Sequence, residues 1–403
     1  MTGFTLENLG LLLLLASLVA MISRRLKLPY SVGLVAAGAA LALLPAAPAV
    51  PLTRELIFNI FLPPLIFEAA LQLRWSRFRA ELPVTLTLAF IGVPIAAATV
   101  ALGLHYLLEW SWLGSALFGA LIAATDPVSV IAAFKEQKVQ PRLAMVVESE
   151  SLLNDGAAAV GFAILVAIAA GAASGPGAVA TALVWTVAGG LGAGVLVAGG
   201  VLLLAGRTED HLVEMTLTAI AAYGSFMLAE QFHASGVLAA LAAGLMVGNV
   251  GWMGSISDEG RPNLLSFWEF LAFLANSLIF ILIGLNQMNQ PIDQLGIEAA
   301  VAIGLVLLGR ALAVYPLAAA FAPTSLALPP AYQHILFWGG LRGALALALA
   351  LAVPASIAEH DQIIALAFAV VAFSVFAQGL TMPLLLRRWR LMQGDRDPVT
   401  PPR

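Results

Sequence analysis

Residues 141–170 read PRLAMVVESESLLNDGAAAVGFAILVAIAA. At about 1.5 Å per residue, a helix of this length is longer than the roughly 30 Å hydrocarbon layer of a bilayer. The stretch is apolar on both sides of its central acidic group, and ionisable side chains at membrane depth are costly and usually functional. The sequence therefore predicts a membrane-spanning helix that carries a polar site.

The composition indicates that lipid surrounds the whole chain. Of its 403 residues, 61% are hydrophobic and 10% are charged, against roughly 45–50% and 25% in an average soluble domain. A soluble core cannot bury so much apolar surface, so we predict an all-α polytopic membrane protein. About thirteen apolar stretches are separated by polar or Pro/Gly-rich connections. They are 5–22, 31–45, 55–73, 83–107, 112–134, 141–170, 178–205, 211–230, 235–250, 264–287, 296–321, 331–352 and 360–387.

The placement of positive charge predicts the orientation. Thirteen spans that start outside put 16 of the 19 Lys and Arg residues on one face, which the positive-inside rule assigns to the cytoplasm. We therefore expect an external N-terminus, a transmembrane domain over 1–390 and a short cytoplasmic tail at 391–403. The first apolar run is preceded by Glu7 and followed by basic residues, the wrong polarity for a cleaved signal peptide.

Other classes of site find little support in the composition. The chain has no cysteine, which excludes disulfides and thiolate metal sites. The net charge of −4 does not suggest a nucleic-acid partner, because the basic residues lie in short loops. The glycines of 189–194 are expected to allow close helix packing, and no cofactor is expected.

A weak internal repeat supports a transporter architecture. Leu65-Ile66-Phe67 recurs as Leu278-Ile279-Phe280, and the same offset of 213 residues aligns Thr125-Asp126-Pro127 with Trp338-Gly339-Gly340. The second pair places two helix-breaking points in corresponding segments. Broken helices in repeat-related positions are typical of binding sites near the membrane midplane. We predict two inverted six-helix repeats joined by a linking helix.

Oxygen-bearing side chains are concentrated in the middle of the quoted stretch. Residues four apart share a helix face, so Glu150 lies next to Asn154, and Ser151 lies next to Asp155. The two pairs lie side by side. The helix therefore offers several oxygen ligands for a cation.

A second group of candidate ligands lies at Thr125-Asp126-Pro127. Proline removes a backbone donor and pushes the preceding residue out of helical geometry. We therefore expect a carbonyl near Thr125 to be free to bind a cation. Asp126 has two compatible interpretations: direct ligation of the cation, or a cap on the half-helix that follows Pro127.

Glu68 is a more distant candidate. It follows Pro63-Pro64 in the third apolar stretch and is expected to face the same cavity. It also lies only six residues before Arg74, so the alternative is a side chain that reaches to the membrane interface.

Two arginines in apolar stretches need partners, because an unpaired buried charge is costly. Arg342 lies in the glycine-broken segment Gly339-Gly340-Leu341-Arg342-Gly343. We expect it to pair with Glu150 and to hold the crossing of the broken helices together. We expect Arg310 to neutralise a second carboxylate.

These residues predict a mechanism. A single carboxylate at Asp155 that binds either a proton or a cation, but not both, makes the two compete for one site. If the protein reorients only when the site is occupied, the competition becomes obligatory exchange. Transport should then fail in strong acid, where the proton is not displaced.

Four separated motifs carry a family resemblance. They are FLPPLIFE at 61–68, TDP at 125–127, ESLLND at 150–155 and GLRG at 340–343. In this order they resemble the signature segments of the monovalent cation/proton antiporter-1 family, the NhaP-like and NHE-like exchangers. The resemblance covers nearly the whole membrane domain, and four motifs together are far more specific than one.

The resemblance implies thirteen helices in a homodimer, with core-domain helices about 55–170 and 264–387 in part and the remainder forming dimerisation and linking helices. It implies that Asp155 binds the cation or the proton. Asp126, Ser151 and the Thr125 carbonyl assist it, and Glu68 contributes from farther away. The supporting residues are Asn154, Glu150, Arg342 and Arg310.

The expected function is exchange of Na⁺ or Li⁺ for H⁺ across a bacterial or archaeal cytoplasmic (inner) membrane. Asn154 before Asp155 resembles the electroneutral branch of the family, which exchanges one cation for one proton. The alternatives are a K⁺/H⁺ antiporter, a cation channel and an intramembrane enzyme. The chain has no H-E-x-x-H or G-x-S-x-G motif, which an intramembrane enzyme would use. We therefore do not expect an enzyme.

Overall fold

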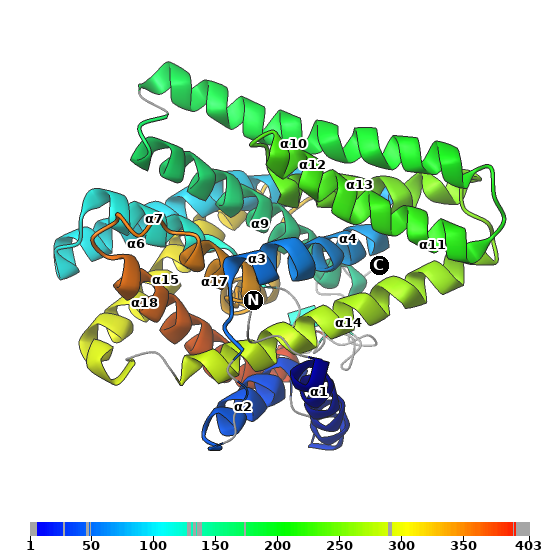
Figure 1. Cartoon of the computed structure of the whole chain (residues 1–403). Helices are drawn as coiled ribbons and strands as arrows, with labels where there is room; N and C mark the ends of the chain where they lie inside the picture. The colour runs from blue at the N-terminus through cyan, green and yellow to red at the C-terminus, as the bar shows by residue number, and fades with distance from the viewer. Residues whose placement is uncertain are drawn as a thin grey trace, which may run out of the picture. The chain divides into compact units, whose positions relative to one another are not determined.

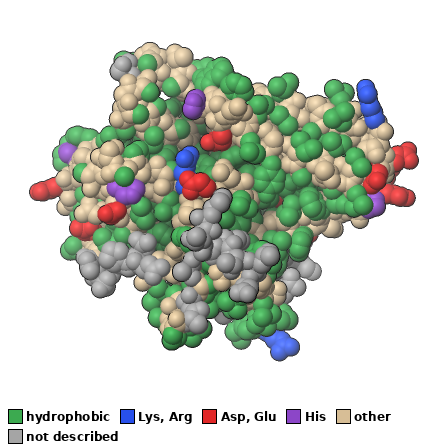
Figure 2. All heavy atoms as spheres, viewed as in Figure 1, with side chains coloured by type: hydrophobic (Ala, Val, Ile, Leu, Met, Phe, Trp, Pro, Cys, Tyr) green, Lys and Arg blue, Asp and Glu red, His purple; other side chains and the backbone are tan. Residues whose placement is uncertain are grey.

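The computed structural model describes residues 6–26, 29–45, 48, 50–126, 130–131, 134, 139–172, 175–288, 292–389 and 391. The regular secondary structure over these residues is helical, apart from an isolated bridge at Val139 (Figure 1). Figure 2 shows hydrophobic side chains over much of the visible surface and few charged ones. The all-α prediction is confirmed.

Most helices coincide with predicted apolar stretches, although α5 begins at Trp75, eight residues before the stretch predicted from 83. Those of the first half are α1 (Leu6–Leu26), α2 (Tyr30–Ala42), α3 (Arg54–Leu56), η1 (Ile57–Phe61), α4 (Leu62–Gln72), α5 (Trp75–Thr87), η2 (Leu88–Gly92), α6 (Val93–Leu108), α7 (Trp112–Ala123), α9 (Pro141–Ala169) and α10 (Pro176–Ala205). Those of the second half are α11 (His211–Ala219), η3 (Ile220–Gly224), α12 (Ser225–Gln231), α13 (Gly236–Asn249), η4 (Gly251–Met253), α14 (Gly260–Gln287), α15 (Ile292–Ala320), α16 (Pro330–Trp338), α17 (Ala344–Leu351), α18 (His360–Phe373), η5 (Ser374–Gly379) and α19 (Leu380–Arg388).

Nine helices in the described part of the chain are long and apolar enough to cross a membrane. Three shorter apolar helices, Asn8–Ser23, Tyr30–Ala42 and Trp112–Ala123, accompany them. The count of thirteen crossings stays a prediction, as do the inverted repeats. The tail predicted at 391–403 lies outside the described residues apart from Leu391.

Several long helices contain a π-helical turn, and proline accounts for most of these turns. A proline has no N–H to donate to the carbonyl four residues earlier. Pro63, Pro94 and Pro383 each leave such a carbonyl inside η1, η2 or η5. The ladder of hydrogen bonds shifts at these points without breaking the helix. No proline follows η3 at this distance, and the sequence does not explain that turn.

The chain divides into two compact units, and the transmembrane domain expected over 1–390 stays a prediction. The first contains Met1–Leu52, Glu81–Ala158 and Phe280–Arg403, and the second contains Thr53–Ala80 and Ala159–Ile279. The segment around α4, which the resemblance assigns to the core domain, thus groups with α10 to α13. The assignment of the remaining helices to dimerisation and linking stays a prediction.

Glycines bring helices of the second unit into close contact. A Cβ at Gly194 of α10 would lie 2.4 Å from the carbonyl oxygen of Ala239 in α13, and one at Gly248 would lie 2.1 Å from that of Leu71 in α4. Only a residue without a side chain allows this approach, as in many membrane helix pairs. The expectation that the glycines of 189–194 serve packing is confirmed at Gly190 and Gly194.

The first unit contains the interrupted helices. Its α6 packs against α7 and α15, and α15 also packs against α16 and α18. A cluster of buried apolar residues joins α9, α15 and α16, and it includes Leu143, Val314 and Ile335. This packing surrounds the segments in which α7 ends and α16 gives way to α17.

Candidate cation-binding site

Two helix breaks cross in the first unit. α7 ends at Ala123, and Ala124 adopts extended geometry with φ −57° and ψ 139°. In the other segment of the crossing, residues 339–343 separate α16 from α17. The Asp126 backbone N–H donates to the Leu341 carbonyl at 2.7 Å. The breaks predicted at Thr125-Asp126 and at Gly339-Gly340 are confirmed, although Pro127 lies outside the described residues.

Gly343 allows the Asp126 side chain to reach the crossing. A Cβ at Gly343 would lie 2.1 Å from Asp126 Oδ2 and 2.7 Å from its Cγ. The backbone at Gly343 is extended, with φ −146°, so the requirement for glycine is one of space. The half-buried Asp126 carboxylate therefore lies against the backbone that begins α17.

Gly343→Ala is expected to displace the Asp126 carboxylate, because overpacking a filled site costs about 1–3 kcal/mol. We expect the cation concentration for half-maximal transport to rise about fivefold or more. The measurement is a salt titration in proteoliposomes. Gly304→Ala is the matched control, because no atom lies within 4 Å of a Cβ there. Equal affinities in the two variants would contradict the role of Gly343.

Ser151 connects α9 to the end of α7. Its hydroxyl donates to the Thr125 carbonyl, and Thr125 Oγ1 lies 3.1 Å from Ser151 Oγ. Both residues are buried, with 3% of Thr125 and 2% of Ser151 exposed. A carbonyl and two hydroxyls thus lie together, which is an oxygen-rich environment of the kind that hard cations prefer.

Asp155 lies beside this group. The backbone N–H of Thr125 interacts with its carboxylate, and Asp126, Glu150 and Arg342 are close enough to act on its charge. Asp155 is half-buried, yet its Oδ1 is enclosed and has no hydrogen-bond partner among the described residues. The structure therefore brings together the predicted residues Thr125, Asp126, Ser151 and Asp155.

Glu150 forms an ion pair with Arg310, not with Arg342. Arg310 Nη1 donates to Glu150 Oε1 at 2.7 Å, and Nη2 donates to Oε2 at 3.1 Å. The same guanidinium donates to the Leu336 carbonyl at 2.9 Å. The predicted pairing of Arg342 with Glu150 is thus wrong, because Arg310 of α15 contacts both carboxylate oxygens of Glu150. Asn154 Nδ2 donates to Glu150 Oε1 at 3.3 Å, so its supporting role has a geometric basis.

Arg342 binds the carbonyl end of α7. Its Nη1 donates to the carbonyls of Ala123 and Ala124 at 2.7 and 2.9 Å. The last carbonyls of a helix lack intrahelical partners and carry partial negative charge. Arg342 therefore stabilises the broken end of α7, and it supports the crossing as predicted but through a different partner.

The charges around the crossing do not cancel. Among the described residues whose charges act at the crossing, the acids are Asp126, Glu150 and Asp155, and the bases are Arg310 and Arg342. With every group ionised, three negative and two positive charges leave one net negative charge. One proton or one monovalent cation would neutralise it.

Glu68 belongs to the other compact unit. It is half-buried on α4, where Gln72 Nε2 donates to Glu68 Oε1. Its predicted contribution to the cation site stays a prediction.

Sequence reasoning missed the contacts of Arg342 and Arg310 with main-chain carbonyls, and it missed Gln378. Carbonyl acceptors leave no trace in the side-chain sequence. Gln378, by contrast, is the only amide between residues 363 and 387 of the apolar run 360–387, and a buried amide in such a run needs a partner. That signal was available.

Known proteins are similar to this chain over most of its length. The family described as sodium/hydrogen exchanger, transmembrane, matches residues 11–388. The chain is 38% identical over 390 residues to the Na⁺/H⁺ antiporter NhaS2 of Synechocystis sp., covering 96% of this chain and 71% of that protein. It is 35% identical over 408 residues to the Na⁺/H⁺ antiporter NhaH of Halobacillus aidingensis, covering 96% and 99%.

A solved structure has the same fold. The sodium proton antiporter MjNhaP1 of Methanocaldococcus jannaschii superposes with a TM-score of 0.72 at 22% identity, over 95% of each chain. Taken with the match over residues 11–388, these similarities show that the chain belongs to the transmembrane sodium/hydrogen exchanger family.

Proposed function

We propose that this integral membrane protein exchanges one Na⁺ or Li⁺ for one H⁺ at Asp155, without net charge movement. The observation that carries the proposal is the enclosed Asp155 Oδ1, which has no hydrogen-bond partner in the described part of the chain. It lies beside a carbonyl and two hydroxyls at a crossing of broken helices. The relatives named as Na⁺/H⁺ antiporters support sodium as the cation.

The ligands we propose for the cation are Asp155, Asp126, the Ser151 hydroxyl and the Thr125 carbonyl. All four supply oxygen, which suits a hard cation. The Ser151 hydroxyl now occupies the Thr125 carbonyl and would rotate away to share it with the ion. Glu68 is proposed as a more distant contributor.

The charge balance supplies the coupling. Asp155 holds a proton or a cation, and each brings the site from one net negative charge to zero. An empty site would carry that net charge through the low-dielectric part of the protein, which is costly. Only the loaded forms therefore reorient, and both are neutral. Exchange of one cation for one proton follows.

We extend the proposal to the setting of the protein. The relatives from bacteria support a location in a bacterial or archaeal cytoplasmic membrane. The distribution of Lys and Arg supports an external N-terminus and a cytoplasmic C-terminus. We also propose a homodimer and no enzymatic activity, as expected for a transporter.

The test uses purified protein in proteoliposomes with an imposed pH gradient. NaCl, LiCl and KCl are added in turn, and the gradient is followed by fluorescence dequenching. We expect Na⁺ and Li⁺ to collapse the gradient, at a rate that does not change when the membrane potential is clamped. A rate that follows the voltage would refute electroneutral exchange. Collapse by K⁺ alone would identify a potassium exchanger, and uncoupled conductance would identify a channel.

A further inference from the structure

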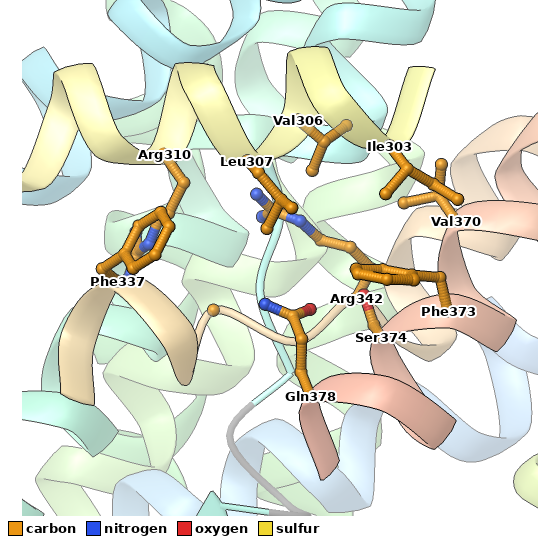
Figure 3. Close-up of a pocket in the computed structure, with 11 residues that line it drawn as sticks. Ile303, Val306, Leu307, Arg310, Phe337, Arg342, Val370, Phe373, Ser374 and Gln378 are labelled. Atoms are coloured by element: carbon orange, nitrogen blue, oxygen red, sulfur yellow. The ribbon is translucent and has the colours of Figure 1, made fainter. Parts of the chain in front are cut away.

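A small cavity lies on the side of the helix break that faces α15 and α18. Its volume is about 10 Å³, which is room for roughly one water molecule. Arg310, Gly340, Arg342, Ser374 and Gln378 line it together with apolar side chains. Figure 3 shows Arg310, Arg342 and Gln378 reaching this space from three separate segments. Nothing described so far gives Gln378 a role.

Gln378 binds the carbonyl end of α16. Its Nε2 donates to the Trp338 carbonyl at 3.1 Å, and only 2% of the residue is exposed. Trp338 in turn donates from its indole Nε1 to Thr381 Oγ1 at 2.8 Å. Two hydrogen bonds therefore attach the last residue of α16 to the segment that begins with η5.

The π turn η5 places Gln378 in this position. A π turn adds a residue to the helical turn, so the residues after it are rotated about the helix by roughly 100° relative to a regular helix. Gln378 is the last residue but one of this turn. Without the extra residue, its amide would face another direction.

The carbonyl ends of α7 and α16 are capped in corresponding ways. An arginine binds Ala123 in α7 and Leu336 in α16, and these residues are separated by the same 213 positions that align Thr125 with Trp338. At Thr125 the carbonyl accepts from the Ser151 hydroxyl. At Trp338 it accepts from the Gln378 amide. The two ends thus share an arginine donor, and a hydroxyl binds the carbonyl of Thr125 where an amide binds that of Trp338.

We propose that Gln378 is a positioning residue that holds the end of α16 fixed, so that the break at 339–343 meets Asp126. A hydroxyl can rotate and yield its carbonyl to an ion, whereas the amide N–H₂ only donates. The Trp338 carbonyl therefore stays occupied while the Thr125 carbonyl becomes available. The asymmetry leaves one cation site at the crossing, and in this respect the inference rests on the proposed function.

The experiment compares Gln378→Met with Gln333→Met. Gln333 Nε2 donates to the Leu328 carbonyl at 2.8 Å, at the other end of the same helix, so the control removes the same kind of bond. We expect Gln378→Met to raise the Na⁺ concentration for half-maximal exchange by roughly three- to tenfold, the worth of one neutral hydrogen bond. We expect its maximal rate to change by less than about twofold, and Gln333→Met to change neither.

A second readout does not depend on transport. Hydrogen exchange is followed by mass spectrometry on peptides that cover 336–346, and we expect faster exchange in Gln378→Met alone. Equal rates of hydrogen exchange in the wild type and both variants would overturn the positioning role. Equal Na⁺ concentrations for half-maximal transport in the three proteins would overturn it too. A wild type without Na⁺-dependent exchange would refute the proposed function, while the hydrogen-exchange comparison would still test Gln378. If Gln378→Met does not fold, Gln378→Asn, which keeps the amide but shortens its reach, is measured in the same way.

Discussion

Asp155→Asn is expected to abolish Na⁺-dependent collapse of the pH gradient, leaving the signal of vesicles without protein. The amide keeps the shape of the side chain but removes the charge for which Na⁺ and H⁺ compete. The site would then be neutral when empty, with no reason to take up either ion. Dequenching in proteoliposomes, with protein amounts matched, measures the loss.

Loss of cation binding should also be visible without transport. A ligand that binds only the folded state stabilises it by about 2.7 kcal/mol at one hundred times its Kd. We expect Na⁺ to raise the unfolding temperature of the wild type and to leave that of Asp155→Asn unchanged. The rise is compared with an equal ionic strength of choline chloride.

Asp361→Asn is the matched control for this change. The Asp361 side chain is fully exposed at the start of α18, so the same substitution there removes one charge from solvent. We expect normal exchange and a normal response to Na⁺. Normal exchange by the Asp155→Asn protein would end the proposed mechanism, whatever its effect on stability.

The second large effect is expected at the ion pair between Glu150 and Arg310. Glu150→Gln leaves a guanidinium that is 5% exposed without its counter-charge. Breaking a buried pair in this way costs about 3–5 kcal/mol, so we expect a clear fall in the free energy of unfolding. Thermal or denaturant unfolding in detergent, followed by tryptophan fluorescence, measures it.

The pair between Arg142 and Glu81 provides the control. These side chains also lie 2.7 Å apart, but 30% of Arg142 and 11% of Glu81 are exposed. Glu81→Gln leaves a guanidinium that water still reaches and that also donates to the carbonyls of Leu326 and Ala327, so we expect it to cost less than Glu150→Gln. Equal losses in Glu81→Gln and Glu150→Gln would contradict the claim that burial makes the inner pair important.

A double variant separates the ion pair from the cap on α16. Arg310 also donates to the Leu336 carbonyl, so Arg310→Met removes two functions, whereas Glu150→Gln removes one. In the double variant no unpaired guanidinium remains, so its loss should be smaller than the sum of the two single losses. Additive losses would show that the two side chains do not act as a pair.

Much of the architecture could be predicted from the sequence because local rules govern it. Each predicted apolar stretch contains helix in its described residues, since a backbone in lipid must satisfy its hydrogen bonds internally. The breaks at Thr125-Asp126 and at Gly339-Gly340 were predicted from proline and glycine, which act on their own neighbourhood. The register of Ser151 and Asp155 on α9 followed from helical period alone.

The partners of the two arginines could not be predicted in this way. Arg310 and Arg342 were both recognised as buried cations, but the choice between them for Glu150 depends on which helix packs against α9. The acceptors of Arg342 are main-chain carbonyls of Ala123 and Ala124, and every residue has such a carbonyl. The division of the chain into two units likewise depends on which distant helices pack together.

The sequence by itself therefore determined that lipid surrounds this protein. It also determined the approximate ranges of its helices, the sites where they break and the acidic residues at the crossing. These properties depend on residue type and on neighbours a few positions away. Only the tertiary structure decided which arginine pairs with Glu150 and which donors bind the carbonyl ends of α7 and α16. It also showed why residue 343 is a glycine. The physical reason is that each of these is a contact between segments far apart in the chain, and a hydrogen bond or a steric limit exists only once packing has brought two atoms within reach of each other.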